Sequence, residues 1–151
     1  MPLPPMIDTD GAWAEILARL DAEFGRVFRC NPRRRFNGKT IVYNTSVQDG
    51  DIEEGVWQVI AKGKPRLFDP DRARRLSWIE SMLEGTAPGL SRWRYIEGDG
   101  TEKIYFWLEA EGYVLILAEK ATVVVLVTAF FVSQDWTEKD LVKRRQNGVQ
   151  F

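Results

Sequence analysis

The stretch from Lys103 to Val132 constrains the fold more than any other part of the chain. It holds three runs of β-branched and aromatic residues, separated by Ala110-Glu111-Gly112 and by residues 119–122. Runs of this kind are typical of β-strands, and connections this short make neighbouring strands antiparallel. The preceding segment ends in Gly98-Asp99-Gly100, which is a strong hairpin signal. The sequence therefore predicts a four-stranded antiparallel meander over residues 92–97, 102–109, 113–118 and 123–132.

The expected turns also predict which side chains share a face of this sheet. A two-residue turn at Asp99-Gly100 places Arg94 opposite Tyr105. Followed across the other two turns, the alternation of side chains gives one polar face and one apolar face. The polar face is expected to carry Arg92, Arg94, Lys103, Tyr105, Trp107, Glu109, Tyr113 and Thr128. The apolar face is the predicted core face, with Trp93, Ile104, Phe106, Leu108, Val114, Ile116, Val123, Val125, Val127, Ala129 and Phe131.

Helices are predicted before and after the sheet. Apolar residues at three- and four-residue spacing predict a helix that is capped within residues 8–10 and ends near Phe28. Asp69-Pro70 predicts the start of a second helix, which Gly85 ends. Shorter elements are a strand over 40–44, a segment over 56–62 that fits either a helix or a strand, and a last helix from Thr137 to about Asn147.

This order of elements predicts the fold class and the domain organisation. Helices first, then antiparallel strands, then a terminal helix indicate an α+β fold, with the N-terminal helices packed on one face of the meander. The opposite face of the sheet is expected to be open. With 151 residues, the chain is expected to form a single domain over 11–151 after a flexible lead over 1–10.

The residue inventory excludes several kinds of chemistry. The chain has no histidine and one cysteine, Cys30, which excludes histidine-based triads, the usual zinc sites and an internal disulfide. It has neither common glycine-rich phosphate loop nor an evident Mg²⁺ site, so no metal and no cofactor is expected. The start lacks a signal-peptide pattern, and the run 123–132 is too short to cross a bilayer, so a cytoplasmic protein without a membrane partner is expected.

The charge is informative in its distribution, because the net charge is only −1. Cations concentrate between Arg26 and Lys39 and between Lys62 and Arg75, which indicates either a polyanion partner or solvated surfaces. For a polyanion, the predicted contacts are Arg33, Arg34, Arg35, Lys62, Lys64 and Arg66. The group Arg72, Arg74 and Arg75 is interpreted as a solvated helix face.

One reaction suits this inventory, namely RNA cleavage by attack of the 2′-hydroxyl on the neighbouring phosphate, which leaves a cyclic phosphate. The substrate supplies the nucleophile, so the protein has only to position it, move protons and stabilise charge. Arg92 and Arg94 are expected to bind phosphate oxygens, and Glu109 to accept the 2′-hydroxyl proton. Further candidates are Tyr105 and Tyr113 as proton donors or phosphate ligands, Trp107 for base stacking, Lys103 as a cation, and Thr128 as a phosphate ligand or a support of Tyr113.

Several segments resemble a known family. They are Tyr113-Val-Leu-Ile-Leu-Ala, Val124-Val-Leu-Val-Thr128-Ala-Phe-Phe-Val, Asp140-Leu-Val-Lys143-Arg, and Arg72-Ala-Arg-Arg-Leu-Ser-Trp78-Ile79. Together they resemble the phage-associated branch of the barnase–EndoU–colicin–RelE nuclease superfamily, over about residues 66–146. The resemblance implies helices followed by a four-stranded antiparallel sheet with a ribonuclease site on its exposed face, RNA as substrate, and a toxin-like activity that an inhibitor or immunity protein would control.

Alternatives from other classes stay open. Many members of the superfamily use histidine, which this chain lacks. A non-catalytic RNA- or protein-binding module on the same scaffold, or a structural or interaction protein of a phage, therefore fits the same pattern. The single residues also have ordinary interpretations: Thr128 as a sheet residue, Arg94 as a cross-strand partner of Tyr105, and Glu109 as an exposed acid beside a turn.

Overall fold

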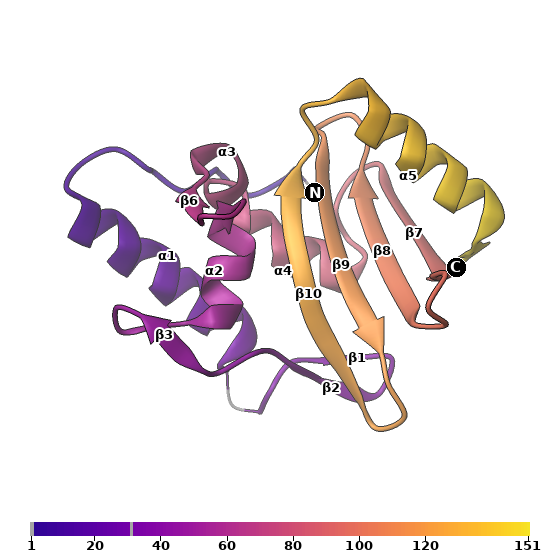
Figure 1. Cartoon of the computed structure of the whole chain (residues 1–151), viewed down its shortest axis with the longest axis horizontal. Helices are drawn as coiled ribbons and strands as arrows, with labels where there is room; N and C mark the ends of the chain where they lie inside the picture. The colour runs from indigo at the N-terminus through magenta and orange to yellow at the C-terminus, as the bar shows by residue number, and fades with distance from the viewer. Residues whose placement is uncertain (1, 31) are drawn as a thin grey trace.

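A mixed sheet of seven strands runs through the molecule (Figure 1). The computed structural model describes residues 2–30 and 32–151. Across the sheet the order is β1-β2-β10-β9-β8-β7-β11, and two small hairpins, β3-β4 and β5-β6, lie outside it. The strands are β1 (Arg35–Phe36), β2 (Lys39–Val42), β3 (Val47–Asp49), β4 (Ile52–Glu53), β5 (Ala61–Lys62), β6 (Leu67–Phe68), β7 (Leu90–Ile96), β8 (Glu102–Leu108), β9 (Tyr113–Glu119), β10 (Val123–Phe131) and β11 (Val149–Gln150).

Helices cover both faces of this sheet. They are α1 (Trp13–Phe28), α2 (Glu54–Ile60), α3 (Pro70–Ala73), the 3₁₀ turn η1 (Leu76–Trp78), α4 (Ile79–Glu84) and α5 (Asp135–Asn147). Figure 1 shows α1, α2 and α4 on one side of the sheet and α5 on the other. No helix in the described ranges has both the length and the hydropathy that a bilayer-spanning segment needs.

The predicted four-stranded antiparallel meander with one open face is wrong. Strands β7 to β10 do lie within two residues of the expected ranges, but β2 pairs with β10 in parallel, and β1 and β11 extend the edges. The added strands have two to four residues, too few to show a period of two in the sequence. The expected open face is covered by α5. The continuous apolar run of β9 is consistent with this, because such runs are typical of strands buried on both faces.

The first hairpin is one residue longer than predicted. Glu97 N donates to Thr101 O over 2.9 Å, so three residues rather than two form the loop. Arg94 therefore lies opposite Ile104 and not opposite Tyr105. Because side chains alternate along a strand, this single residue moves Arg94 to the other face of the sheet.

The second hairpin is also one residue longer than predicted. Leu108 pairs with Tyr113 across a four-residue loop, and Gly112 closes the loop with a positive φ of 71° that favours glycine. Tyr113 thereby joins the face towards α1 and α4, where it packs edge-on against Trp78 with 5.9 Å between ring centroids. A bulge in β10 then shifts its pairing with β9, so that Thr128 lies opposite Ile116.

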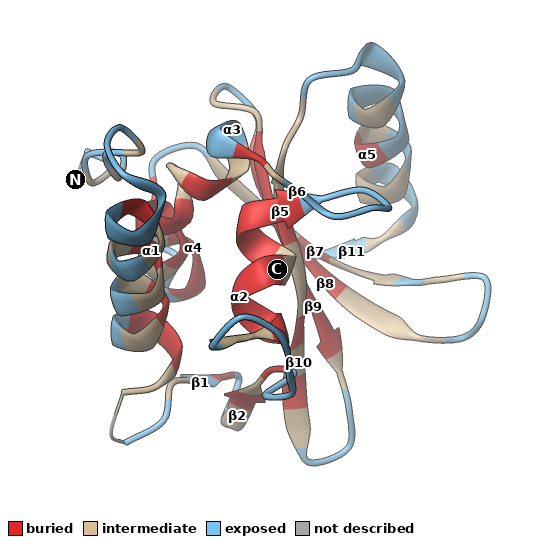
Figure 2. Cartoon of the chain, turned by 60° about the vertical axis from the view of Figure 1, so that its left-hand side comes forward, coloured by how far each residue is buried: buried red, intermediate tan, exposed pale blue. Residues whose placement is uncertain are grey.

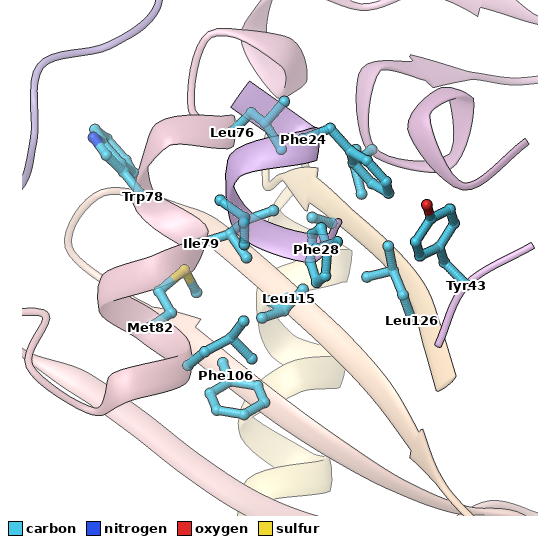
Figure 3. Close-up of a cluster of buried hydrophobic side chains, with 14 of the residues drawn as sticks. Phe24, Phe28, Tyr43, Leu76, Trp78, Ile79, Met82, Phe106, Leu115 and Leu126 are labelled. Carbon is cyan, nitrogen blue, oxygen red and sulfur yellow. The ribbon is translucent and has the colours of Figure 1, made fainter. Parts of the chain in front are cut away.

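The helix predicted from Asp69 to Gly85 has the expected ends and a broken middle. Asp69 caps it by accepting hydrogen bonds from Asp71 N and Arg72 N, and Gly85 closes it with a φ of +75°. Between them the chain forms α3, η1 and α4 instead of one continuous helix. The break keeps Leu76, Trp78 and Ile79 buried against α1 and the sheet (Figure 3).

Other element boundaries differ in smaller ways. α1 starts after Ala12 without a side-chain cap, so a cap within residues 8–10 is wrong. α5 starts at Asp135, two residues before the predicted cap Thr137. The ambiguous segment 56–62 is mainly helical, as α2, and ends in β5.

The main core lies between the sheet and the helices α1, α2 and α4. Phe24 and Phe28 of α1 meet Leu115 and Leu126 of the sheet there, and all four side chains are buried (Figure 3). Helix α2 is buried along most of its length between α1 and β10 (Figure 2). Gly55 permits this packing, because a Cβ atom at that position would lie 2.5 Å from the ring of Tyr43.

Candidate functional site

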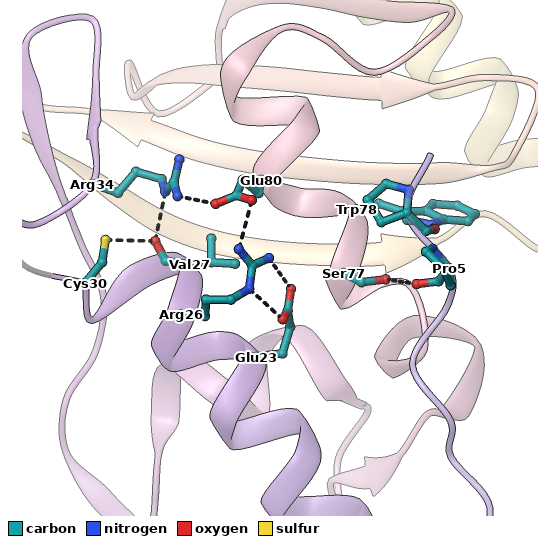
Figure 4. A network of polar contacts seen from close by, with 10 residues as sticks. Pro5, Glu23, Arg26, Val27, Cys30, Arg34, Ser77, Trp78 and Glu80 are labelled. Atoms are coloured by element: carbon teal, nitrogen blue, oxygen red, sulfur yellow. Dashed lines mark hydrogen bonds and ion pairs between the residues drawn. The ribbon is translucent and has the colours of Figure 1, made fainter. Parts of the chain in front are cut away.

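Four of the six cations between Arg26 and Lys39 pair with carboxylates, and Figure 4 shows two of them, Arg26 and Arg34. Arg26 pairs with Glu23 and Glu80, and Arg34 pairs with Glu80 at 2.5 Å while its Nε donates to Val27 O. The hydrogen bond from Arg26 is the main cause that lowers the pKa of Glu80 below its usual value. Arg34 therefore has a structural role between α1 and α4.

The other cations of this segment are dispersed. Arg29 pairs with Asp21 and Glu53, and Lys39 pairs with Glu119. Of the predicted contacts, Arg33 lies over the ring of Tyr43 at 5.6 Å, and Arg35 donates only a long hydrogen bond of 3.4 Å to Gly38 O within the described residues. These side chains do not converge on one ligand-sized space.

Four members of the predicted site lie on the face covered by α5. These are Lys103, Tyr105, Trp107 and Glu109. The hydroxyl of Tyr105 donates to Glu97 over 2.5 Å and accepts from Arg144 over 3.0 Å, while burial and the Glu97 bond raise its pKa. Tyr105, Trp107 and Glu109 contact α5, whereas Lys103 pairs with Glu97 at 3.9 Å. All four face away from the remaining candidates.

Glu109 and Trp107 also contact α5. The carboxylate of Glu109 pairs with Arg145 at 2.9 Å. The same guanidinium lies 4.9 Å from the centroid of the Trp107 ring, which is 1% exposed. A base cannot stack on that ring while α5 is docked.

Arg92, Arg94 and Tyr113 lie on the opposite face from Tyr105. Both guanidinium groups lie 5.0 Å from the ring centroid of Phe151, and Arg94 also pairs with Glu119 at 3.3 Å. Tyr113 is fully buried, which raises the pKa of its hydroxyl. The structure thus separates the predicted constellation into groups on two faces of the sheet.

Thr128 lies in a different and better-formed place, a hollow between α2, the β5-β6 hairpin, α3 and β10. Its volume is about 250 Å³. The side chains that line it include Trp57, Gln58, Lys62, Arg66, Arg72 and Thr128. We call this hollow the Arg72 pocket. Three of the residues predicted for catalysis or binding meet here: Thr128, Lys62 and Arg66.

Arg72 is the central cation of the pocket, and its interpretation as part of a solvated helix face is wrong. Its side chain is only 15% exposed. Its Nη1 atom donates to Ala61 O over 2.7 Å, to Gln58 O over 3.2 Å and to Thr128 Oγ1 over 3.4 Å. The first two acceptors are carbonyl groups at the C-terminal end of α2, where a positive charge is favoured.

The other two nitrogen atoms of the Arg72 guanidinium, Nε and Nη2, donate no hydrogen bond within the described residues. The Nε atom is also buried. Asp69 Oδ2 lies 3.9 Å from Nε, which is an ion pair without a hydrogen bond. Burial lowers the pKa of Arg72, but an arginine remains a cation at neutral pH.

Thr128 joins Arg72 to α2. Its hydroxyl donates to Gln58 O over 3.0 Å and accepts from Arg72. The β10 bulge beside Thr128 aims the side chain at α2, away from the α5 face that contains Val127 and Phe130. The hydroxyl thus fixes the position of the guanidinium.

Arg66 and Lys62 form the rim. Arg66 binds both carboxylate oxygens of Glu54 and lies 5.5 Å from the centroid of the Trp57 ring. Lys62 is 62% exposed and lies 3.7 Å from Asp69. Lys64, which was also predicted to bind a polyanion, is exposed and lies outside the lining of the pocket.

The pocket combines three cations with two carboxylates, those of Glu54 and Asp69, and so has a net charge of +1. A partly buried guanidinium beside a hydroxyl is suited to a phosphate group. The described ranges contain no cluster of three or more His, Cys, Asp or Glu side chains suited to a metal ion.

Comparison of the chain with family models, with curated proteins and with solved structures finds no match. The resemblance to the nuclease superfamily therefore depends on the sequence segments alone. Two of those segments contain Arg72 and Thr128, which lie 56 positions apart and meet in the pocket. The sequence analysis selected Thr128 as a site residue but interpreted Arg72 as part of a solvated helix face.

Proposed function

We propose that this protein is a metal-independent endoribonuclease that binds a backbone phosphate of RNA in the Arg72 pocket. The observation that carries the proposal is the convergence of Arg72 of α3, Arg66 and Lys62 of the β5-β6 hairpin, and Thr128 of β10 on one hollow. The resemblance of the Arg72 and Thr128 segments to ribonucleases supports the same reaction class.

The reaction needs charge stabilisation more than it needs a protein nucleophile. The 2′-oxygen of RNA forms a bond to phosphorus, the bond from phosphorus to the 5′-oxygen breaks, and a 2′,3′-cyclic phosphate results. Arg72 and Arg66 stabilise the negative charge that develops on the phosphate oxygens. The ammonium group of Lys62 donates a proton to the departing 5′-oxygen, and solvent accepts the proton of the 2′-hydroxyl.

A second candidate function is RNA binding without cleavage. One observation favours it: both carboxylates of the pocket, Glu54 and Asp69, are engaged by cations. Neither is therefore free to act as a general base in this conformation.

The experiment that tests the proposal is incubation of the purified protein with labelled single-stranded RNA in EDTA. We expect fragments that end in a cyclic phosphate. Lys62→Ala should lower the rate by on the order of 100-fold, since loss of a general acid typically costs about 10²–10⁴ in rate. Lys139→Ala, the same change at an exposed position on α5, is the matched control and should keep full activity.

The outcomes separate the two candidates. RNA that stays intact over a range of pH but is bound more weakly by the Lys62 variant supports binding without cleavage. RNA that is neither cut nor bound rules out both.

A further inference from the structure

The ring of Phe151 lies beside two cations at one edge of the sheet. Its centroid is 5.0 Å from the guanidinium carbon of Arg92 and 5.0 Å from that of Arg94. The pairing of β11 with β7 positions the ring, because Phe151 N donates to Arg92 O over 3.3 Å directly after Gln150. Aromatic rings set among cations are typical of surfaces that bind single-stranded nucleic acids.

The ring of Phe151 is held in place and is open to solvent. The residue is 47% exposed, whereas Trp93, Phe106 and Trp107 of the neighbouring strands β7 and β8 are at most 1% exposed. Phe36, which belongs to the main core, packs against the ring with 6.1 Å between the two centroids. A fixed and partly uncovered ring is what a base needs as a stacking surface.

The two guanidinium groups beside the ring are accessible and incompletely neutralised. Arg92 makes no ion pair, and its side chain donates no hydrogen bond, within residues 2–30 and 32–151. Arg94 pairs with Glu119 at 3.3 Å, but the same carboxylate also binds Lys39 over 3.2 Å. Both arginines are partly exposed. Arg92 therefore lacks an anionic partner, and a phosphate group would supply one.

We infer that Phe151, Arg92 and Arg94 form a nucleotide-binding site, in which a base stacks on the Phe151 ring while its phosphate pairs with Arg92. None of these residues lines the Arg72 pocket, so this site is a separate contact for a single-stranded nucleic acid. The inference goes beyond the proposed function, because the site binds a strand whether or not the Arg72 pocket cleaves it. Stacking and ion pairing do not involve the 2′-hydroxyl, so the site accepts RNA and DNA alike.

The test measures the binding of DNA, which the proposed reaction cannot cut because DNA has no 2′-hydroxyl. The probe is a fluorescein-labelled single strand of about ten deoxyadenosine nucleotides, and its matched control is an abasic strand of the same length. Fluorescence anisotropy with the intact protein gives both affinities. We expect the strand with bases to bind on the order of 5- to 100-fold more tightly, the effect of stacking one base.

Phe151→Leu tests the stacking surface, because leucine keeps an apolar contact with Phe36 but has no aromatic face. The variant should bind the strand with bases as weakly as the abasic strand, while its affinity for the abasic strand should not change. Its melting temperature should stay that of the wild type. Trp136→Leu, the same change at an exposed ring on α5, is the matched control and should keep both wild-type affinities.

Arg92→Gln tests the phosphate contact. It should weaken the binding of both strands and reduce the salt dependence of the affinity by about 0.7 log units per log unit of salt, the effect of one phosphate contact on a single strand. Lys139→Gln removes the same charge from an exposed position on α5 and should leave the salt dependence unchanged.

Each outcome bears on the inference. Equal affinity of the wild type for the two strands overturns the stacking of a base, and so does a preference for bases that persists in Phe151→Leu. An unchanged salt dependence in Arg92→Gln overturns the phosphate contact. If neither strand binds, the whole site fails, whereas the cleavage assay with Lys62→Ala decides the proposed function separately.

Discussion

The two faces of the sheet are covered by helices in different ways. The face towards α1, α2 and α4 is buried by a large cluster of aliphatic and aromatic side chains, with Leu20, Phe24 and Phe28 of α1 fully buried. On the other face, α5 contributes a single buried residue, Leu141. Figure 2 shows the same contrast, since α2 is almost wholly buried whereas α5 is largely exposed.

On the α5 face, charged side chains add to a smaller apolar cluster that includes Trp93, Trp107 and Leu141. Arg144 binds Glu97 and the hydroxyl of Tyr105, and Arg145 binds Glu109 at 2.9 Å. Salt screens half-exposed ion pairs and thereby weakens them, whereas it does not weaken apolar contacts by screening. The helices of the first face should therefore be part of the cooperative core, and α5 should open more readily.

The Arg72 pocket lies beside α2, one of the helices that cover the well-packed face of the sheet. It is built on the C-terminal end of α2, whose flanking residues Trp57 and Val59 are buried. Sites on rigid, packed elements hold their geometry better than sites on loosely attached ones. The separation of the faces thus places the candidate chemistry on the stable face.

Phe24→Ala should have the largest effect, because it removes a fully buried ring from the first face. We expect a loss of about 3–5 kcal/mol in the free energy of unfolding, measured by denaturant titration. The matched control is Trp136→Ala on α5, where the residue is 71% exposed and the loss should stay below about 0.5 kcal/mol. Similar losses in the two variants would contradict the contrast between the faces.

Glu97→Gln should have a smaller and more local effect, because it removes the charge that holds Arg144. We expect a loss of about 1–2 kcal/mol, the value of a partly buried hydrogen bond to a charged group. Native-state hydrogen exchange should show faster exchange in α5 than in α1. Equal acceleration in both helices would mean that α5 belongs to the cooperative core.

How far the sequence predicts this molecule can be judged from particular elements. The positions of β7 to β10 follow from runs of β-branched and aromatic residues. Such residues favour a strand whichever strand lies next to it in the sheet. The register does not follow, because Gly98-Asp99-Gly100 is compatible with loops of two or three residues. That one-residue difference decided on which face Arg94 lies.

The candidate site was harder to predict for a different reason. Arg72 is buried because its guanidinium group binds carbonyl groups at the end of α2, those of Gln58 and Ala61. The parallel pairing of β2 with β10 likewise joins Thr40 to Val123, two residues that lie far apart in the sequence. Local periodicity contains no information on such contacts. The sequence analysis therefore interpreted Arg72 as part of a solvated helix face, although the segments that resemble the nuclease superfamily include both Arg72 and Thr128.

Glu80 should make the stability of the face covered by α1, α2 and α4 depend on pH. Glu80 joins α1 to α4 through Arg26 and Arg34, and the Arg26 hydrogen bond lowers its pKa in the folded state. A depressed pKa stabilises the fold above the ordinary value of 4.5, and this contribution is lost as the pH falls through the folded-state pKa. Glu80→Gln should therefore lose less stability than the wild type between pH 6 and pH 3, by up to about 1 kcal/mol. Parallel stability curves for the two proteins would show that Glu80 contributes nothing to acid sensitivity.

Glu109→Gln should have the smallest effect, and it distinguishes the two faces as places for chemistry. Glu109 is 44% exposed and pairs with Arg145 on the α5 face, so we expect a loss of about 0–1 kcal/mol that disappears at high salt. If RNA is cleaved in the Arg72 pocket, the rate of this variant in EDTA should equal that of the wild type, because the carboxylate lies on the other side of the sheet from Thr128. A 100-fold loss of cleavage at an unchanged unfolding midpoint would instead make Glu109 the general base, and would require α5 to leave the sheet during the reaction.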